Sequence, residues 1–141
     1  MEVQRAQNLK FQGQNYSPKP KTLLQEKSYS FSIRIICFLE TLQKDFLSQI
    51  ITKQLLRSAT SIGANIIEAK GSGSRKDFAN FFTYALKSAN ESECWLCLLR
   101  DSKKADAQYV ENLLAENHSL CRMLGSSLLT LRGKKEPSTS L

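Results

Sequence analysis

The sequence predicts an all-α protein, an up-down-up-down antiparallel four-helix bundle. Only six of the 141 residues are Gly and three are Pro, a composition that disfavours a turn-rich β fold. Four long segments repeat apolar residues at steps of three and four, which is helical spacing. Short connections between such segments favour antiparallel neighbours. The length fits one domain with one core.

The first two helices are expected over residues 22–44 and 47–70, with a break at Asp45. Gly63 lies inside the second helix, where a missing side chain often allows a close neighbour. The G-S-G-S run, residues 71–74, ends that helix and forms a loop. The apolar stripe of the first helix is Leu24, Phe31, Ile35, Phe38, Leu39 and Leu42, and that of the second is Ile50, Ile51, Leu55, Ala59, Ile62 and Ile66.

The third helix is expected to open at S-R-K-D, residues 74–77, and to run to about residue 102. This run resembles a capping box with Asp in place of the usual Glu. The fourth helix is expected over residues 106–131. Their apolar sides are Phe78, Phe81, Phe82, Ala85, Ala89, Leu96 and Leu99 in the third, and Tyr109, Leu113, Leu120, Leu124, Leu128 and Leu131 in the fourth.

The bundle is assigned to residues 22–132, between a flexible basic arm, residues 1–21, and a flexible basic tail, residues 133–141. Pro18 and Pro20 break helical order in the arm. The formal net charge is +7, and the excess of basic residues lies mainly in the arm and tail. Basic termini suggest an anionic partner, although they also serve solubility alone.

No apolar signal region and no long apolar run occur in the sequence, so we expect a cytoplasmic protein without a membrane span. The four cysteines, Cys37, Cys94, Cys97 and Cys121, are then expected to be reduced thiols.

Two polar stripes follow the second and third helices. Residues Arg57, Ser61, Asn65 and Glu68 recur at steps of four and three, and so share one helical face. An antiparallel turn near residue 72 places them opposite Ser88 and Glu91. We predict a polar network between the two stripes, and breaking a buried ion pair typically costs about 3–5 kcal/mol. The stripe could instead fix helix register alone, lie at a subunit interface, or meet a ligand.

A basic pole is predicted at one end of the bundle. The first and third helices begin there, and the second and fourth helices end there. The start of the third helix adds the positive end of its dipole. The basic pole consists of Lys19, Lys21, Lys70, Arg75, Lys76, Arg132, Lys134 and Lys135.

No motif points to catalysis, a metal or a cofactor. Cys94 and Cys97 form a C-x-x-C, but it lies far from a helix N-terminus, where such thiols are activated. His118 is expected about 9 Å along the axis from Cys94, which does not suit a tetrahedral zinc site. Tyr84 and Trp95 are interpreted as core or interface anchors, since base stacking would require exposure.

Several segments in order resemble one small protein family. They are Q-L-L-R-S-A-T-S-I-G-A-N-I-I-E-A (54–69), S-R-K-D-F (74–78), A-L-K-S-A-N-E (85–91) and W-L-C-L-L-R-D-S (95–102). Together with E-K-S-Y-S-F (26–31) they are similar to the four helix bundle protein family, also named for the 23S rRNA intervening-sequence protein. The likeness covers about residues 22–131. Leu56 and Ile67 depart from it, standing where relatives often carry Arg and Glu.

The resemblance implies a homo-oligomer, usually a pentamer, and no reaction. Relatives are encoded within rRNA intervening sequences. A similar fold serves as the accessory protein of diversity-generating retroelements, beside a reverse transcriptase and nucleic acid.

Three hypotheses for function remain. The first is a non-enzymatic oligomer whose basic poles bind RNA or DNA. The second is a protein-interaction scaffold, for example a partner of a reverse transcriptase, without nucleic-acid contact. The third, a metal-dependent nuclease acting through Glu91, is the weakest.

Overall fold

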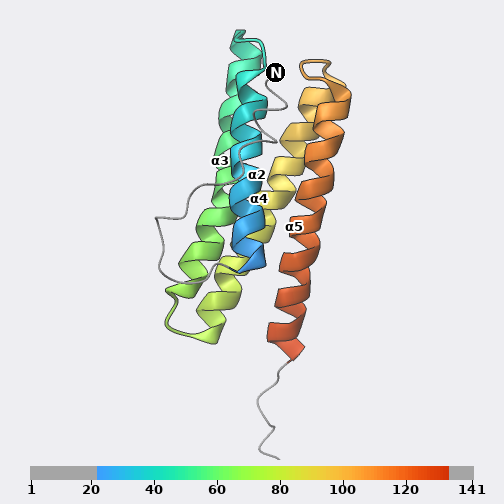
Figure 1. Ribbon diagram of the computed structural model, residues 1–141. Helices are drawn as coiled ribbons and strands as arrows, with labels where there is room; N and C mark the ends of the chain where they lie inside the picture. The colour runs from blue at the N-terminus through green and yellow to red at the C-terminus, as the bar shows by residue number, and fades with distance from the viewer. Residues whose placement is uncertain (1–21, 134–141) are drawn as a thin grey trace, which may run out of the picture.

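The computed structural model describes residues 22–133, which form four helices and no strand within that range (Figure 1). The chain runs up α2 (Leu23–Glu40), down α3 (Phe46–Lys70), up α4 (Arg75–Asp101) and down α5 (Ala107–Gly133). Each helix packs against the one before it, and α2 also packs against α5, which closes the ring. The predicted all-α, antiparallel four-helix bundle is confirmed.

Side-chain caps set where the helices begin. Thr22 forms a full capping box with Gln25 at the start of α2, each side chain bonding the other's backbone N–H. Asp45 accepts from the Ser48 backbone N–H at 3.1 Å before α3, and Ser74 accepts from that of Asp77 at 3.1 Å before α4. Each cap satisfies an N–H group that has no partner within its helix.

The end of α4 is closed by a residue in the left-handed conformation. Lys103 has φ 58°, and its N–H donates to the Arg100 carbonyl at 3.0 Å. The N–H of Lys104 reaches the Leu99 carbonyl, also at 3.0 Å. These two bonds define a Schellman motif, in which glycine usually occupies the position of Lys103.

The core lies along the bundle axis and receives the predicted apolar stripes of all four helices, with exceptions. Half-buried residues at its margin are Leu39, Leu42, Ile51, Phe78, Phe81 and Tyr109. Leu131 is also only half-buried, and Ile50 is exposed. The fully buried side chains of largest volume are Phe31, Ile35, Phe38, Leu55, Ile62, Leu96, Leu99, Val110, Leu113, Asn117, Leu120 and Leu124.

The helix ends differ from the prediction in two places. The first helix ends at Glu40, four residues early, where the Thr41 hydroxyl donates to the Phe38 carbonyl at 2.6 Å. Asp45 has an extended backbone as the cap of α3, so the intervening residues form the connection. The last helix continues to Gly133. Residues 1–21 and 134–141, predicted to be flexible, lie outside the described residues.

Small side chains let neighbouring helices approach closely. A Cβ placed on Gly63 of α3 would lie 3.4 Å from the Ser28 hydroxyl oxygen of α2, so the predicted close neighbour of Gly63 is α2. Small residues also occupy core positions of α3 and α4, where Ala59, Ala85 and Ala89 are fully buried. Interiors pack at crystal-like density, so these positions tolerate little added volume.

Candidate nucleic-acid interface

One end of the bundle brings together the start of α4 and the ends of α3 and α5 (Figure 1). The Arg75 guanidinium Nη2 donates to the backbone carbonyl of Leu131 at 3.0 Å, which links α4 to the last turns of α5. The described members of the basic pole, Lys70, Arg75, Lys76 and Arg132, are all exposed there. Lys19, Lys21, Lys134 and Lys135 lie outside the described residues.

The charges of this end remain directed to solvent. Glu68 and Asp77 are also exposed nearby, and they reduce the positive field without removing it. Within residues 22–133, Lys70, Lys76 and Arg132 form no ion pair. The N-terminus of α4 adds a partial positive charge at the same place. Such an arrangement suits phosphate groups, which bind lysine, arginine and helix N-termini.

The predicted polar stripes meet at one point. Arg57 of α3 forms an ion pair with Glu91 of α4, and the Trp95 indole Nε1 donates to the same Glu91 oxygen at 3.2 Å. The Arg57 side chain is 57% exposed and that of Glu91 is 37% exposed. Because exposed ion pairs contribute only about 0–1 kcal/mol, the larger cost expected for a buried pair does not apply.

The other predicted members of the network do not bond between α3 and α4. The Ser61 hydroxyl donates to the Arg57 carbonyl at 2.7 Å, and the Asn65 amide donates to the Ser61 carbonyl at 2.8 Å, both within α3. Ser88 contributes its backbone carbonyl to a hydroxyl of its own helix, and Glu68 is exposed. A helical carbonyl four residues back is the nearest acceptor for such side chains, so these groups do not need a partner on another helix.

The buried polar contact between α3 and α4 lies elsewhere, at Ser58 and Ser92. Their hydroxyl oxygens are 2.8 Å apart and both residues are fully buried. We did not predict this pair from sequence. The available signal was position, because each serine interrupts the apolar stripe of its helix, and a polar residue at a core position needs a partner.

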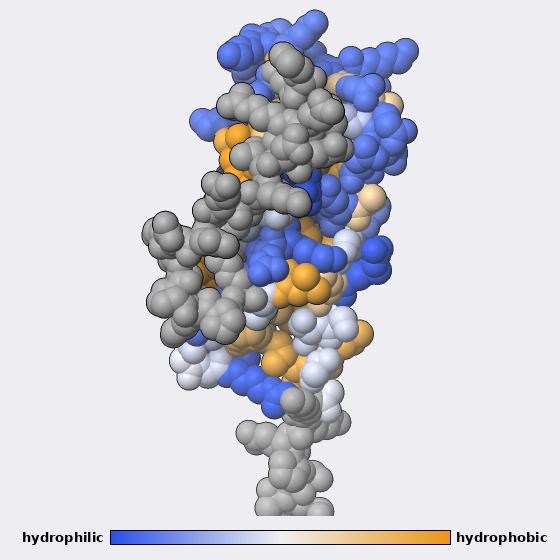
Figure 2. All heavy atoms as spheres, viewed as in Figure 1, coloured by the Kyte–Doolittle hydropathy of each residue, from blue (hydrophilic) through white to orange (hydrophobic). Residues whose placement is uncertain are grey.

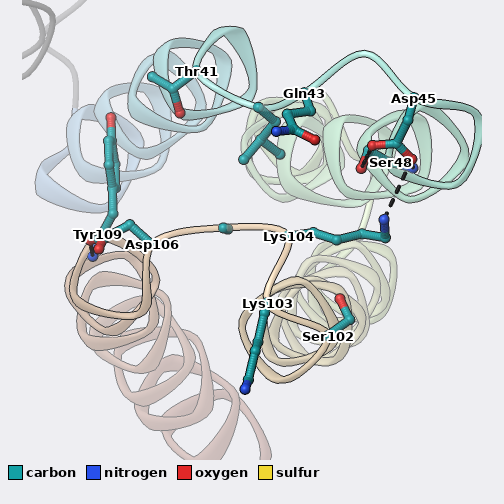
Figure 3. A pocket seen from close by; sticks show the side chains of 11 residues that line it. Thr41, Gln43, Asp45, Ser48, Ser102, Lys103, Lys104, Asp106 and Tyr109 are labelled. Carbon is teal, nitrogen blue, oxygen red and sulfur yellow. Dashed lines mark hydrogen bonds and ion pairs between the residues drawn. The ribbon is translucent and has the colours of Figure 1, made fainter.

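The opposite end of the bundle holds an open depression of about 980 Å³ between residues 41–48 and residues 102–109 (Figure 3). Lys104 extends across it to Asp45, at 3.4 Å. Hydrogen bonds from the Ser48 side chain and backbone, with the charge of Lys104, lower the pKa of Asp45 to about 2. The charge at this end is nearly balanced, because three lysines lie there with three aspartates: Lys44, Lys103, Lys104, Asp45, Asp101 and Asp106.

The cysteines and His118 form no group of three metal-binding side chains within residues 22–133. His118 Nε2 lies 3.1 Å from a Glu93 carboxylate oxygen, so His118 of α5 contacts the residue that precedes Cys94 on α4. Burial raises the pKa of the Cys97 and Cys121 thiols. A raised pKa favours the protonated thiol, which is the less reactive form.

Large apolar side chains are also exposed, and they concentrate on α3. On the face presented in Figure 2, hydrophobic residues also reach the surface in the lower part, on the side of α5. Of the eleven exposed large hydrophobic residues among those described, five belong to α3: Phe46, Leu47, Ile50, Leu56 and Ile67. Ile67 and Leu56, the two departures from the family pattern, are thus on the surface. Exposed apolar patches often mark an interface.

The sequence and fold together place the chain among known proteins. A family model described as the 23S rRNA-intervening sequence protein matches residues 21–126. The chain belongs to this family. Its structure is also similar to a crystal structure of a protein of unknown function from the S23 ribosomal protein family of Bacteroides thetaiotaomicron. That protein is 39% identical, with a TM-score of 0.69, over 75% of this chain and 98% of the other.

No curated protein matches the chain. Within residues 22–133, none of the helices combines the length and apolar character that crossing a membrane requires. The family match and the similar crystal structure confirm the predicted family and fold. The family name refers to rRNA and names no reaction.

Proposed function

We propose that this protein is a non-enzymatic accessory protein that binds RNA through the basic pole. The observation that carries the proposal is the grouping of exposed, unpaired cations around the N-terminus of α4. The tie between Arg75 and the Leu131 carbonyl holds α4 and α5 together at this end. The family name, which refers to rRNA, favours RNA over DNA as the anion.

Binding of this kind is electrostatic and independent of sequence. Each lysine or arginine that neutralises a phosphate releases a counterion, so the affinity falls as salt rises. No base-specific contact is required at the pole, and contacts to phosphate fix position without reading sequence.

Charge reversal at each end of the bundle tests the proposal. The double variant Lys70→Glu/Lys76→Glu should lose most RNA binding at about 50 mM salt. The matched control, Lys44→Glu/Lys103→Glu, changes the net charge equally at the opposite end, where both lysines are exposed. Filter binding with a structured RNA measures the affinity. Equal losses in both variants would point to net charge alone, and no binding by the wild-type protein would refute the proposal.

We further propose that the chain assembles as a homo-oligomer in the cytoplasm, as the resemblance implied, with a pentamer as the expected form. The exposed apolar residues of α3 favour this, because burying them against another subunit would remove apolar surface from water. Several copies would multiply the charge of the basic pole. Light scattering on the wild-type protein and on Phe46→Ser/Ile50→Ser would test it. A wild-type mass equal to that of one chain would contradict it.

A protein scaffold is the second candidate, and the same apolar surface favours it. A partner such as a reverse transcriptase would then cover α3 without RNA contact by this chain. Pull-down after nuclease treatment separates the two candidates, since a scaffold keeps its partner while an RNA-mediated complex dissociates.

A further inference from the structure

Four exposed side chains form a ridge along the outer face of α4, starting at the basic pole. They are Lys76, Asn80, Tyr84 and Lys87, at steps of four, four and three. These steps place them one above another on a single helical face. At about 1.5 Å per residue the ridge is about 16 Å long.

Tyr84 is the feature of this ridge that helix packing does not explain. The core side of α4 is formed by Phe82, Ala85 and Ala89, whereas Tyr84 is 50% exposed. Its ring meets Phe81 at an interplanar angle of 87°, with the ring centroids 6.2 Å apart. In such a T-shaped pair, Phe81 covers at most one face of the Tyr84 ring. The contact limits the motion of the ring, and about half of the Tyr84 surface remains open to solvent.

The neighbours of Tyr84 on the ridge are suited to a polyanion. Lys76 and Lys87 form no ion pair within residues 22–133. The carboxylate four residues beyond Lys87, that of Glu91, is held by Arg57 and Trp95. The Asn80 amide offers both a donor and an acceptor. A cation, an amide, an aromatic ring and a second cation therefore follow one another.

We propose that Tyr84 stacks on an unpaired base of single-stranded RNA whose phosphates lie against Lys76 and Lys87. This proposal rests on the proposed function, RNA binding through the basic pole, and adds that the bound RNA is single-stranded. Proteins that bind single strands combine a basic path for the backbone with aromatic rings for the bases. Bases inside a duplex are stacked on each other, so Tyr84 cannot reach their faces.

A protein partner fits this ridge less well than RNA does. Protein interfaces are enriched in Tyr but depleted of Lys at their buried centre, and here two lysines flank the ring. Burying Lys76 and Lys87 against a protein would require acidic partners for both.

The test uses a labelled, unstructured RNA of about 20 nucleotides, longer than the single-strand site of one binding domain. The same RNA annealed to its complement serves as the duplex probe. Fluorescence anisotropy at one fixed salt concentration gives the affinities of the wild-type protein, Tyr84→Ala and Tyr84→Phe. Leu98→Ala is the control, because Leu98 lies further along α4 and is 45% exposed. Light scattering reports the mass of each variant.

Tyr84→Ala should bind the single strand about tenfold more weakly and the duplex as the wild-type protein does. Tyr84→Phe, which keeps the ring, and Leu98→Ala should retain full affinity. The inference would be overturned if Tyr84→Ala bound the single strand as tightly as the wild-type protein, or if it lost as much affinity for the duplex. A changed mass would also overturn it, because it would mark Tyr84 as a subunit contact. If Lys70→Glu/Lys76→Glu loses binding while Tyr84→Ala does not, only the stacking role fails. If the wild-type protein binds neither probe, both the stacking role and the proposed function fail.

Discussion

The hydroxyl oxygens of Ser58 and Ser92 lie 2.8 Å apart in the middle of the α3–α4 contact, where both residues are fully buried. The Ser92 hydroxyl is also 2.8 Å from the Ser88 carbonyl, and that of Ser58 is 3.2 Å from the Leu55 carbonyl. Each hydroxyl carries one proton, so a consistent arrangement has Ser92 donating to Ser88 and Ser58 donating to Ser92.

The two serines should be energetically coupled. Ser58→Ala and Ser92→Ala should each lower the free energy of unfolding by about 1 kcal/mol. The double variant should cost less than the sum of the single variants by about 0.5–1 kcal/mol, since the shared hydrogen bond is lost only once. Urea unfolding of the four proteins gives this coupling. Strict additivity would show that the hydroxyls satisfy only their own helices.

Asn117 carries a buried polar atom at a cost to stability. Its amide donates to the Ala89 carbonyl at 2.9 Å, but its Oδ1 has no hydrogen-bond partner within residues 22–133. Asn117→Leu should raise the free energy of unfolding by about 1–2 kcal/mol, because a side chain of similar shape replaces an unsatisfied acceptor. Asn117→Ala, which leaves a cavity, should lower it. A loss of stability in the Leu variant would show that the unsatisfied Oδ1 is not a net cost to the fold.

Lys103 holds a conformation that glycine adopts without strain. A non-glycine residue in the left-handed region costs about 1–2 kcal/mol, so Lys103→Gly should raise the free energy of unfolding by about 0.5–1 kcal/mol after the entropic cost of glycine. Lys103→Val should lower it. Lys44→Gly makes the same replacement where φ is not positive and should give no gain. Equal effects of the two glycine variants in urea unfolding would contradict this account.

Acid should weaken the cap of α3. Bonds from Ser48, with the charge of Lys104, lower the pKa of Asp45 from 3.8 to about 2 in the folded protein. The unfolded chain therefore binds the proton first as pH falls. The stabilisation by Asp45 is complete above about pH 4 and is lost progressively between about pH 4 and pH 2. Urea midpoints of the wild-type protein should fall more steeply across this window than those of Asp45→Asn, and parallel curves would refute the assignment.

Most of the fold could be predicted from sequence because helical periodicity is a local property. The stripes through Phe31, Leu55, Leu96 and Leu124 indicated four helices, and the short connections indicated their order. The end of the first helix was missed because Leu42 continues the apolar spacing beyond Glu40. That end depends on the Thr41 side chain and on Asp45 capping the next helix, and such boundaries are the weakest part of a periodicity argument.

The candidate site was predictable only in part. Antiparallel order alone places Lys70, Arg75 and Arg132 at one end, and the register near residue 72 predicts the contact of Arg57 with Glu91. The exposure of that pair, and the in-helix bonds of Ser61 and Asn65, depend on side-chain rotation about α3, which spacing does not give. Tyr84 was interpreted as an anchor for the same reason, since sequence cannot show that half of its surface faces solvent.

The salt dependence of binding reports whether the lysines of the basic pole contact RNA phosphates, as we propose. The logarithm of the affinity for the single-stranded probe should be measured between about 50 mM and 200 mM salt for the wild-type protein and for Lys70→Gln/Lys76→Gln. Each lost phosphate contact should flatten the slope against the logarithm of salt concentration by about 0.7. The slope of the double variant should therefore be flatter than that of the wild-type protein by about 1.4. An unchanged slope would show that these lysines do not contact the RNA.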